Sequence, residues 1–139
     1  MYITANATQT VVTQGNVLFT DAVICGCRSI YHRPGSGLVT LKGVTNQCRA
    51  RFKITFGANV ALATGATVAP TEVAIAINGE PINTTTMITT PAAVGNLWNI
   101  STETYIDVPS GCCTYLTVKN IGTTSIDIQN ANLIVERVA

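Results

Sequence analysis

The chain has 139 residues, of which 11% are charged and 47% are apolar, and its formal net charge is +1. This composition is typical of one folded domain rather than a disordered segment, and a charge so close to zero excludes a general electrostatic grip on nucleic acid. No apolar run reaches the roughly 18 to 20 residues that span a bilayer, and the first residues lack a basic and apolar leader. We therefore expect neither a membrane helix nor a secretory signal.

β-Branched residues dominate the composition. Thr, Val and Ile supply about 50 of the 139 residues, and their stiff side chains fit a pleated strand better than a helix. Eleven Gly and five Pro interrupt the chain at short intervals, as turn residues do in proteins built from strands. The expected fold class is all-β.

Apolar and polar residues alternate with a period of two, which indicates strands with one buried face. In chain order the expected strands are Gln9–Thr13, Asn16–Val23, Leu38–Lys42, Arg49–Phe56, Glu72–Ile77, Thr86–Thr89, Leu97–Val108, Cys112–Lys119 and Ser125–Val138. Turn residues separate them at 33–37, 78–81, 108–111 and 119–122, and Asn78-Gly79 suits a type I′ hairpin turn. About eight to ten short strands predict a two-sheet jelly-roll sandwich that occupies residues 1–139 as a single domain.

The closing segment does not alternate cleanly. Leu133 and Val135 are expected on one face, and Ile134 and Val138 on the other. A sandwich strand with a solvated outer face should be polar at every second position, so the outer face is expected to be covered. In a chain this short, a second copy is the economical cover, and we expect symmetric self-association. A small surface apolar patch on a monomer is the alternative.

Three segments of the C-terminal third resemble a known family. They are Ile106-Asp107-Val108-Pro109-Ser110-Gly111, the strand Thr114–Asn120, and Ile126–Arg137 with its Asn130-Ala131-Asn132-Leu133-Ile134-Val135 core. A "V-P-x-G" turn, a strand that ends in Asn and a last strand "N-A-x-L-x-V" are similar to the end of a TNF/C1q-like jelly roll. The resemblance is to the versions found in exosporium collagen-like glycoproteins and phage structural proteins.

The resemblance implies a compact homotrimer around a threefold axis. This sequence shows no Gly-X-Y collagen-like stalk, and the domain, with no signal expected, suits a non-enzymatic phage virion component, either a capsid decoration or a head-fibre protein. Such a component would assemble in the host cytoplasm, with the major capsid protein as a partner. The alternative is a trimeric domain on a bacterial cell or spore surface, of the exosporium type, that binds a glycan or a partner protein.

Two groups of residues are candidates for these contacts. We expect the oligomer interface to include Tyr115, Leu133, Ile134 and Val135. Arg49, Arg51 and Lys53 form a basic stripe on one face of their strand. The stripe is either a solvated face that protects a strand edge, or a docking surface for carboxylates of a neighbouring subunit, such as Glu136 or Asp107, or of a capsid.

The five cysteines leave three interpretations open. Cys25, Cys27, Cys48, Cys112 and Cys113 lack the paired CxxC spacing of a zinc ribbon. Buried free thiols that act as small apolar side chains are the first interpretation, and a disulfide such as Cys27 with Cys48 is the second. A metal site that adds His32 is the third. No cofactor or metal ion is expected.

The remaining polar and aromatic residues do not form an active-site pattern. The seven carboxylates are scattered without the facing pair that glycosidase chemistry needs, and nothing around His32 matches a Cys–His nucleophile. Trp98 and Tyr105 are candidates for a sugar-stacking platform, although packing in the core or an interface is the favoured role for Trp98.

Overall fold

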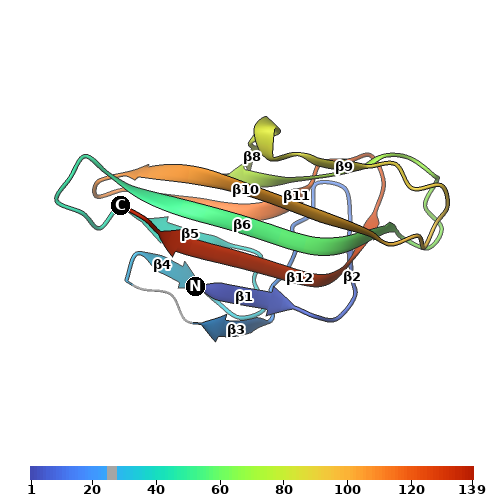
Figure 1. The fold of residues 1–139 in the computed structure, drawn as a ribbon, viewed down its shortest axis with the longest axis horizontal. Coiled ribbons are helices and arrows are strands. Elements are labelled where there is room, and N and C mark those ends of the chain that lie inside the picture. The colour runs from blue at the N-terminus through green and yellow to red at the C-terminus, as the bar shows by residue number, and fades with distance from the viewer. Residues whose placement is uncertain (25–27) are drawn as a thin grey trace.

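The computed structural model describes residues 1–24 and 28–139, which form twelve strands and one short 3₁₀ helix (Figure 1). The elements are β1 (Tyr2–Ala5), β2 (Gln9–Val11), β3 (Asp21–Ile24), β4 (Ile30–His32), β5 (Val39–Lys42), β6 (Arg49–Leu62), β7 (Thr71–Ile77), β8 (Glu80–Pro81), η1 (Asn83–Thr85), β9 (Met87–Thr89), β10 (Trp98–Pro109), β11 (Cys113–Asn120) and β12 (Ile126–Arg137). The described residues contain no helix that is long and apolar enough to cross a membrane.

The strands form two antiparallel sheets. The first, which we call the β12 sheet, has the order β10-β6-β12-β1-β3, and β2 also pairs with β12. The second, the β11 sheet, has the order β4-β5-β11-β7-β8, and β9 also pairs with β7. The first and last strands of the chain lie side by side, with Tyr2 opposite Ile134 (Figure 1). Most neighbours, such as β12 with β1 and β6 or β11 with β5 and β7, are distant in sequence. The sandwich is a jelly roll, as predicted.

The predicted alternation places the core between the two sheets. Along β6, Phe52, Ile54 and Phe56 are fully buried, and the residues between them are partly exposed. The rings of Phe19 and Phe56 meet edge to face with centroids 6.4 Å apart, an arrangement that aromatic pairs prefer. The largest fully buried side chains also include Ile3, Leu41, Leu62, Ile75, Leu116, Ile126, Ile128 and Leu133.

A β-bulge in β12 changes which residues of the closing strand face the core. Gln129 pairs with Asn59 and Asn132 pairs with Gly57, so three steps on β12 oppose two on β6. Asn130 absorbs the extra residue with φ of 56°, in the left-handed region that Asn tolerates. The burial phase shifts there, from Ile126 and Ile128 to the odd-numbered Ala131, Leu133 and Val135. Val138 lies beyond the strand, so Ile134 is its exposed large apolar residue on the outer face.

The predicted strand Asn16–Val23 is wrong over most of its length. Its alternation is present, with Val17 and Phe19 buried around an exposed Leu18, but the segment crosses between the sheets. The amide of Val17 donates to Val118 of the β11 sheet, and that of Thr20 donates to Thr4 of the β12 sheet. Apart from a single β-bridge between Asn16 and Lys119, strand pairing therefore begins only at Asp21.

Three short strands were not predicted, because they contain too few residues for alternation to be recognised. β1, β4 and β8 have four, three and two residues. The predicted Asn78-Gly79 turn is confirmed, because both residues have positive φ, of 53° and 84°.

Candidate functional site

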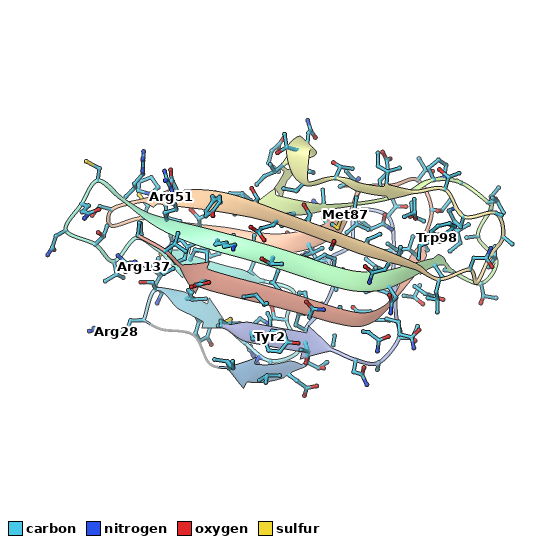
Figure 2. The ribbon with its side chains drawn as sticks, viewed as in Figure 1. Tyr2, Arg28, Arg51, Met87, Trp98 and Arg137 are labelled. Atoms are coloured by element: carbon cyan, nitrogen blue, oxygen red, sulfur yellow. The ribbon has the colours of Figure 1, made fainter. Side chains whose placement is uncertain are left out.

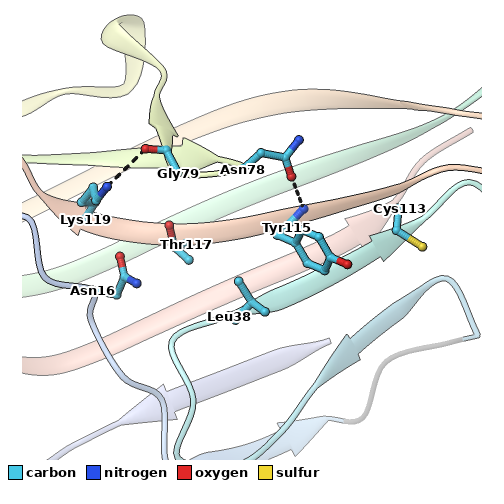
Figure 3. Close-up of a pocket in the computed structure, with 8 residues that line it drawn as sticks. All are labelled: Asn16, Leu38, Asn78, Gly79, Cys113, Tyr115, Thr117 and Lys119. Atoms are coloured by element: carbon cyan, nitrogen blue, oxygen red, sulfur yellow. Dashed lines mark hydrogen bonds between the residues drawn. The ribbon is translucent and has the colours of Figure 1, made fainter.

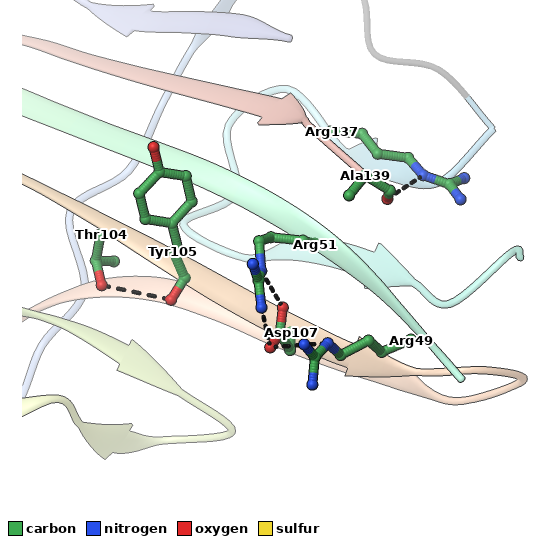
Figure 4. A network of polar contacts seen from close by, with 7 residues as sticks. All are labelled: Arg49, Arg51, Thr104, Tyr105, Asp107, Arg137 and Ala139. Carbon is green, nitrogen blue, oxygen red and sulfur yellow. Dashed lines mark hydrogen bonds and ion pairs between the residues drawn. The ribbon is translucent and has the colours of Figure 1, made fainter. Parts of the chain in front are cut away.

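The outer face of the β12 sheet has a charged half on β6 and β10. Register places Arg51 opposite Asp107. The Arg51 guanidinium donates to both carboxylate oxygens, with Nε 2.8 Å from Oδ1 and Nη2 3.1 Å from Oδ2 (Figure 4). The Nε of Arg49 lies 3.3 Å from Oδ2 of the same carboxylate. Lys53 Nζ lies 3.4 Å from Oε1 of Glu103.

These contacts hold the pKa of Asp107 below its ordinary value, because Arg51 donates hydrogen bonds to the ionised carboxylate and Arg49 adds a favourable charge. The pKa of Arg51 is raised, chiefly by the same hydrogen bonds. Docking of the basic stripe on carboxylates of a neighbouring subunit, such as Glu136 or Asp107, stays a prediction. Cross-strand register brings Asp107 to Arg49 and Arg51 within one chain, and the stripe is largely compensated by its own neighbours.

The other half of this face carries an apolar patch of Tyr2, Ile24 and Ile134, which we call the Ile134 patch. Tyr2 lies opposite both Ile24 on β3 and Ile134 on β12, so the three side chains form a row across three strands. Ile24 is 60% exposed and Ile134 is 40% exposed. A groove of about 430 Å³ runs over them. Tyr2 is labelled on β1 in Figure 2.

The four residues expected at an oligomer interface do not share a surface. Leu133 and Val135 are 1% and 0% exposed and belong to the core of the single chain, so they offer nothing to a second subunit. Their assignment is corrected: the bulge turns them inward. Ile134 faces outward on the β12 sheet, whereas Tyr115 faces outward on the β11 sheet.

A second groove, of about 590 Å³, lies on the outer face of the β11 sheet along β11 (Figure 3). We call it the β11 groove. Tyr115, Thr117 and Lys119 line it, since they alternate outward along the strand. Asn78, in the β7–β8 turn, and Asn16 flank them. Two sequence features belong to this groove: the Asn78-Gly79 turn and the alternating residues Cys113, Tyr115, Thr117 and Lys119. No motif connects them, so sequence reasoning missed the groove.

The described cysteines lie at the surface, whereas the histidine lies in the interior. Cys48, Cys112 and Cys113 are exposed, so the prediction of buried thiols is wrong for these three, which lie in or beside end loops. Cys25 and Cys27 lie outside the described residues, and interpretations that involve them stay predictions. His32 is buried, with Nε2 donating to the Ser36 carbonyl at 2.8 Å and its ring 6.4 Å from that of Phe19.

Among the described residues, the side chains considered for a metal site and for a sugar-stacking platform lie apart. Within residues 1–24 and 28–139, no three His, Cys, Asp or Glu side chains form a group that could hold a metal ion. Trp98 is 49% exposed, so it is not part of the core, and its alternative place in an interface stays a prediction. Trp98 and Tyr105 are seven residues apart on an unbroken strand. They therefore point to opposite faces, roughly 23 Å apart along β10, and form no common platform.

Comparison with known proteins bears on the fold. No family model matches the sequence, and no curated protein matches it. The globular domain of the zebrafish complement 1qA protein is similar in structure, with a TM-score of 0.63 and 9% identity, and the match covers 96% of this chain and 93% of that domain.

Two further solved structures are more remote. CBM35 from Cellvibrio japonicus has a TM-score of 0.45 and 10% identity, covering 100% of this chain and 99% of that one. The CBM22-1 xylan-binding domain from Paenibacillus barcinonensis has 0.36 and 12%, covering 99% and 87%. Of these three likenesses, the first bears on the fold. The chain has a TNF/C1q-like jelly-roll fold of two antiparallel sheets.

Proposed function

We propose that the chain is a non-catalytic structural domain that forms a homotrimer through the outer face of its β12 sheet, and that it serves as a phage virion component, as a capsid decoration or head-fibre protein. The observation that carries the assembly is the Ile134 patch. Three apolar side chains on adjacent strands line one groove of about 430 Å³ on a sheet face whose other half is charged.

Burial of the Ile134 patch would supply the driving force. Each large apolar side chain removed from water contributes roughly 1.5 to 3 kcal/mol when fully buried, and the patch offers Ile24 at 60% and Ile134 at 40% exposure. The adjacent charges are already paired within the chain, with Arg51 on Asp107 and Lys53 on Glu103. A subunit that covers this face would therefore meet compensated charges rather than a repulsive field.

The number three is supported by resemblance. Residues 106–137 resemble trimeric TNF/C1q-like jelly rolls, and the fold is similar to that of the zebrafish C1q globular domain. A closed threefold ring uses two different surfaces of each subunit. The Ile134 patch is one of them, and Leu133 and Val135 are no part of either.

Light scattering with the variant Ile134→Glu tests the assembly. The wild-type chain should have a mass of about 44 kDa at micromolar concentration, three times 14.6 kDa. Ile134→Glu should shift the mass toward one chain, because it places a charge in the contact. Val68→Glu, at a similarly exposed residue in the β6–β7 loop, is the matched control and should stay trimeric. A wild-type mass near 14.6 kDa would refute the trimer.

The virion role needs its own test, since assembly and location are separate claims. A cryo-EM map of intact particles that carry the chain should contain threefold density that fits the sandwich, in contact with the major capsid protein. Neighbouring genes for capsid, portal and tail proteins would agree with this role. Genes for export or spore-coat proteins would instead favour the bacterial cell or spore surface.

A further inference from the structure

The β11 groove has a rigid floor. Tyr115 is bound to Asn78 through both of its backbone groups. The Tyr115 amide donates to Asn78 Oδ1 at 3.0 Å (Figure 3). The backbone amide of Asn78 donates to the Tyr115 carbonyl at 2.8 Å. β11 also pairs with β5 on one side and β7 on the other. The Tyr115 ring, 45% exposed, is therefore presented on a fixed backbone in the middle of a sheet.

Hydrogen-bonding groups line the groove along β11 from this ring to Lys119. Asn78 uses Oδ1 on the Tyr115 amide, which directs its amide nitrogen away from that bond. Lys119 Nζ donates to the Gly79 carbonyl at 3.2 Å and has two further protons. Asn16 adds a second exposed amide on the opposite rim. Donors and acceptors thus continue along the groove beyond the aromatic ring.

Thr117 supplies the second and independent sign of a ligand. It is 6% exposed, lines the groove, and its hydroxyl has no hydrogen-bond partner among the described residues. A buried hydroxyl without a partner is unfavourable by about 1 to 3 kcal/mol, so native structures usually satisfy such groups. The oxygen is covered by neighbouring atoms, so a ligand hydroxyl would satisfy it once the side chains over it move aside.

We propose that the β11 groove binds a saccharide. The groove is formed within one chain, so the proposal holds whether the chain is a trimer or a monomer. A sugar ring has an apolar C–H face that stacks on an aromatic ring and a rim of hydroxyls that exchange hydrogen bonds with amides, hydroxyls and an ammonium group. Those are the groups that Tyr115, Asn78, Thr117 and Lys119 present. The described lining residues include no carboxylate.

Two other ligand classes fit less well. A peptide that binds by strand addition needs a free sheet edge, and β11 is paired on both sides. Single-stranded nucleic acid needs several stacked aromatics along a basic track, and this groove has one aromatic ring and one lysine.

A printed glycan array, followed by calorimetric titration with a soluble form of the strongest binding glycan, tests the site. The wild-type chain should bind at least one glycan class, and Tyr115→Ala should weaken its affinity about tenfold or more. Thr117→Val should weaken binding while the melting temperature without glycan stays equal or rises, because the unpaired hydroxyl is replaced by a methyl group of similar size.

Tyr105→Ala is the matched control, since Tyr105 is an exposed tyrosine, at 59%, on the other sheet. It should bind glycan as the wild type does. The proposal is overturned if the wild type binds nothing on the array, or if Tyr115→Ala binds unchanged. It is also overturned if Tyr115→Ala lowers the mass in light scattering, because the groove would then be a subunit contact. If the chain proves not to be a trimer, the glycan-binding measurements still test the groove.

Discussion

Gly43 joins two end loops by a backbone approach that no side chain permits. A Cβ atom at this position would lie 2.1 Å from the carbonyl oxygen of Pro109. The Gly43 amide donates to Cys112 and the Gly43 carbonyl accepts from Gly111, both at 2.9 Å. The absence of a Cβ atom therefore lets the loop after β5 pack directly on the β10–β11 turn.

Gly43→Ala should lower the free energy of unfolding by about 3 kcal/mol or more, because backbone atoms on both sides must move apart. Urea denaturation measures this. Gly57→Ala is the control: its Cβ would lie 3.4 Å from the Asn132 side chain, an ordinary contact, so its stability should change by less than about 1 kcal/mol. Equal effects of the two variants would contradict the argument from close approach.

Asp107 couples stability to acidic pH. Its pKa is lower in the folded chain than in the unfolded one, where it is about 3.9. Below that value the unfolded state binds more protons, so this contribution, complete above about pH 4, is lost as pH falls through the folded pKa. Asp107→Asn should flatten the acid limb of stability against pH, measured by urea denaturation at several pH values. Arg51→Gln should have the same effect, and a wild-type slope in both would contradict the assignment.

The β12 bulge depends on the left-handed backbone of Asn130. Its amide nitrogen donates to Asn6 Oδ1 at 2.6 Å, and its own Oδ1 accepts from Asn59 at 3.1 Å. These bonds fix the extra residue whose insertion turns Leu133 and Val135 toward the core.

Asn130→Val should destabilise the chain by about 2 kcal/mol or more, since a β-branched residue resists positive φ. Asn130→Gly loses the same side-chain bonds but accepts the backbone, and so should cost about 1 kcal/mol less. Thermal or urea unfolding of the two variants gives the comparison. If Val were tolerated as well as Gly, backbone conformation would not hold the bulge.

The elements differ in how far sequence patterns could predict them. Period-two alternation predicted β10 to within one residue at each end, and it predicted where β6 begins. It missed the last six residues of β6, which continues past Phe56 to Leu62. The segment 16–23 alternates as well, yet its hydrogen bonds go to both sheets in turn. Alternation reports that every second side chain is buried, and a chain that crosses between the sheets can produce this pattern without continuous strand pairing.

The two outer faces of the sandwich have separate proposed roles. The β12 sheet presents the Ile134 patch, and the β11 sheet presents the β11 groove. A trimer that covers the first face would display three grooves together, and avidity would then strengthen binding to a dense glycan surface.

Two variants should distinguish the role of the Ile134 patch from that of the β11 groove. Ile134→Glu should bind an immobilised glycan surface more weakly than the wild type, since avidity is lost, while its affinity for the same glycan free in solution is unchanged. Tyr115→Ala should lose affinity in both formats and remain trimeric. Surface binding and solution calorimetry on the same preparations measure the difference. Loss of solution affinity in Ile134→Glu would contradict independent faces.

Local chemistry was enough to predict the all-β class, the jelly-roll sandwich and the Asn78-Gly79 turn, because alternation, β-branching and positive φ are properties of neighbouring residues. It could not predict that Leu133 and Val135 face inward, that Asp107 pairs with Arg51, or that Tyr115 and Thr117 line one groove with Asn78. Those outcomes depend on which strands pair, in which register, and where one extra residue enters β12. Such pairings join residues far apart in the chain, and only the packed sandwich decides them.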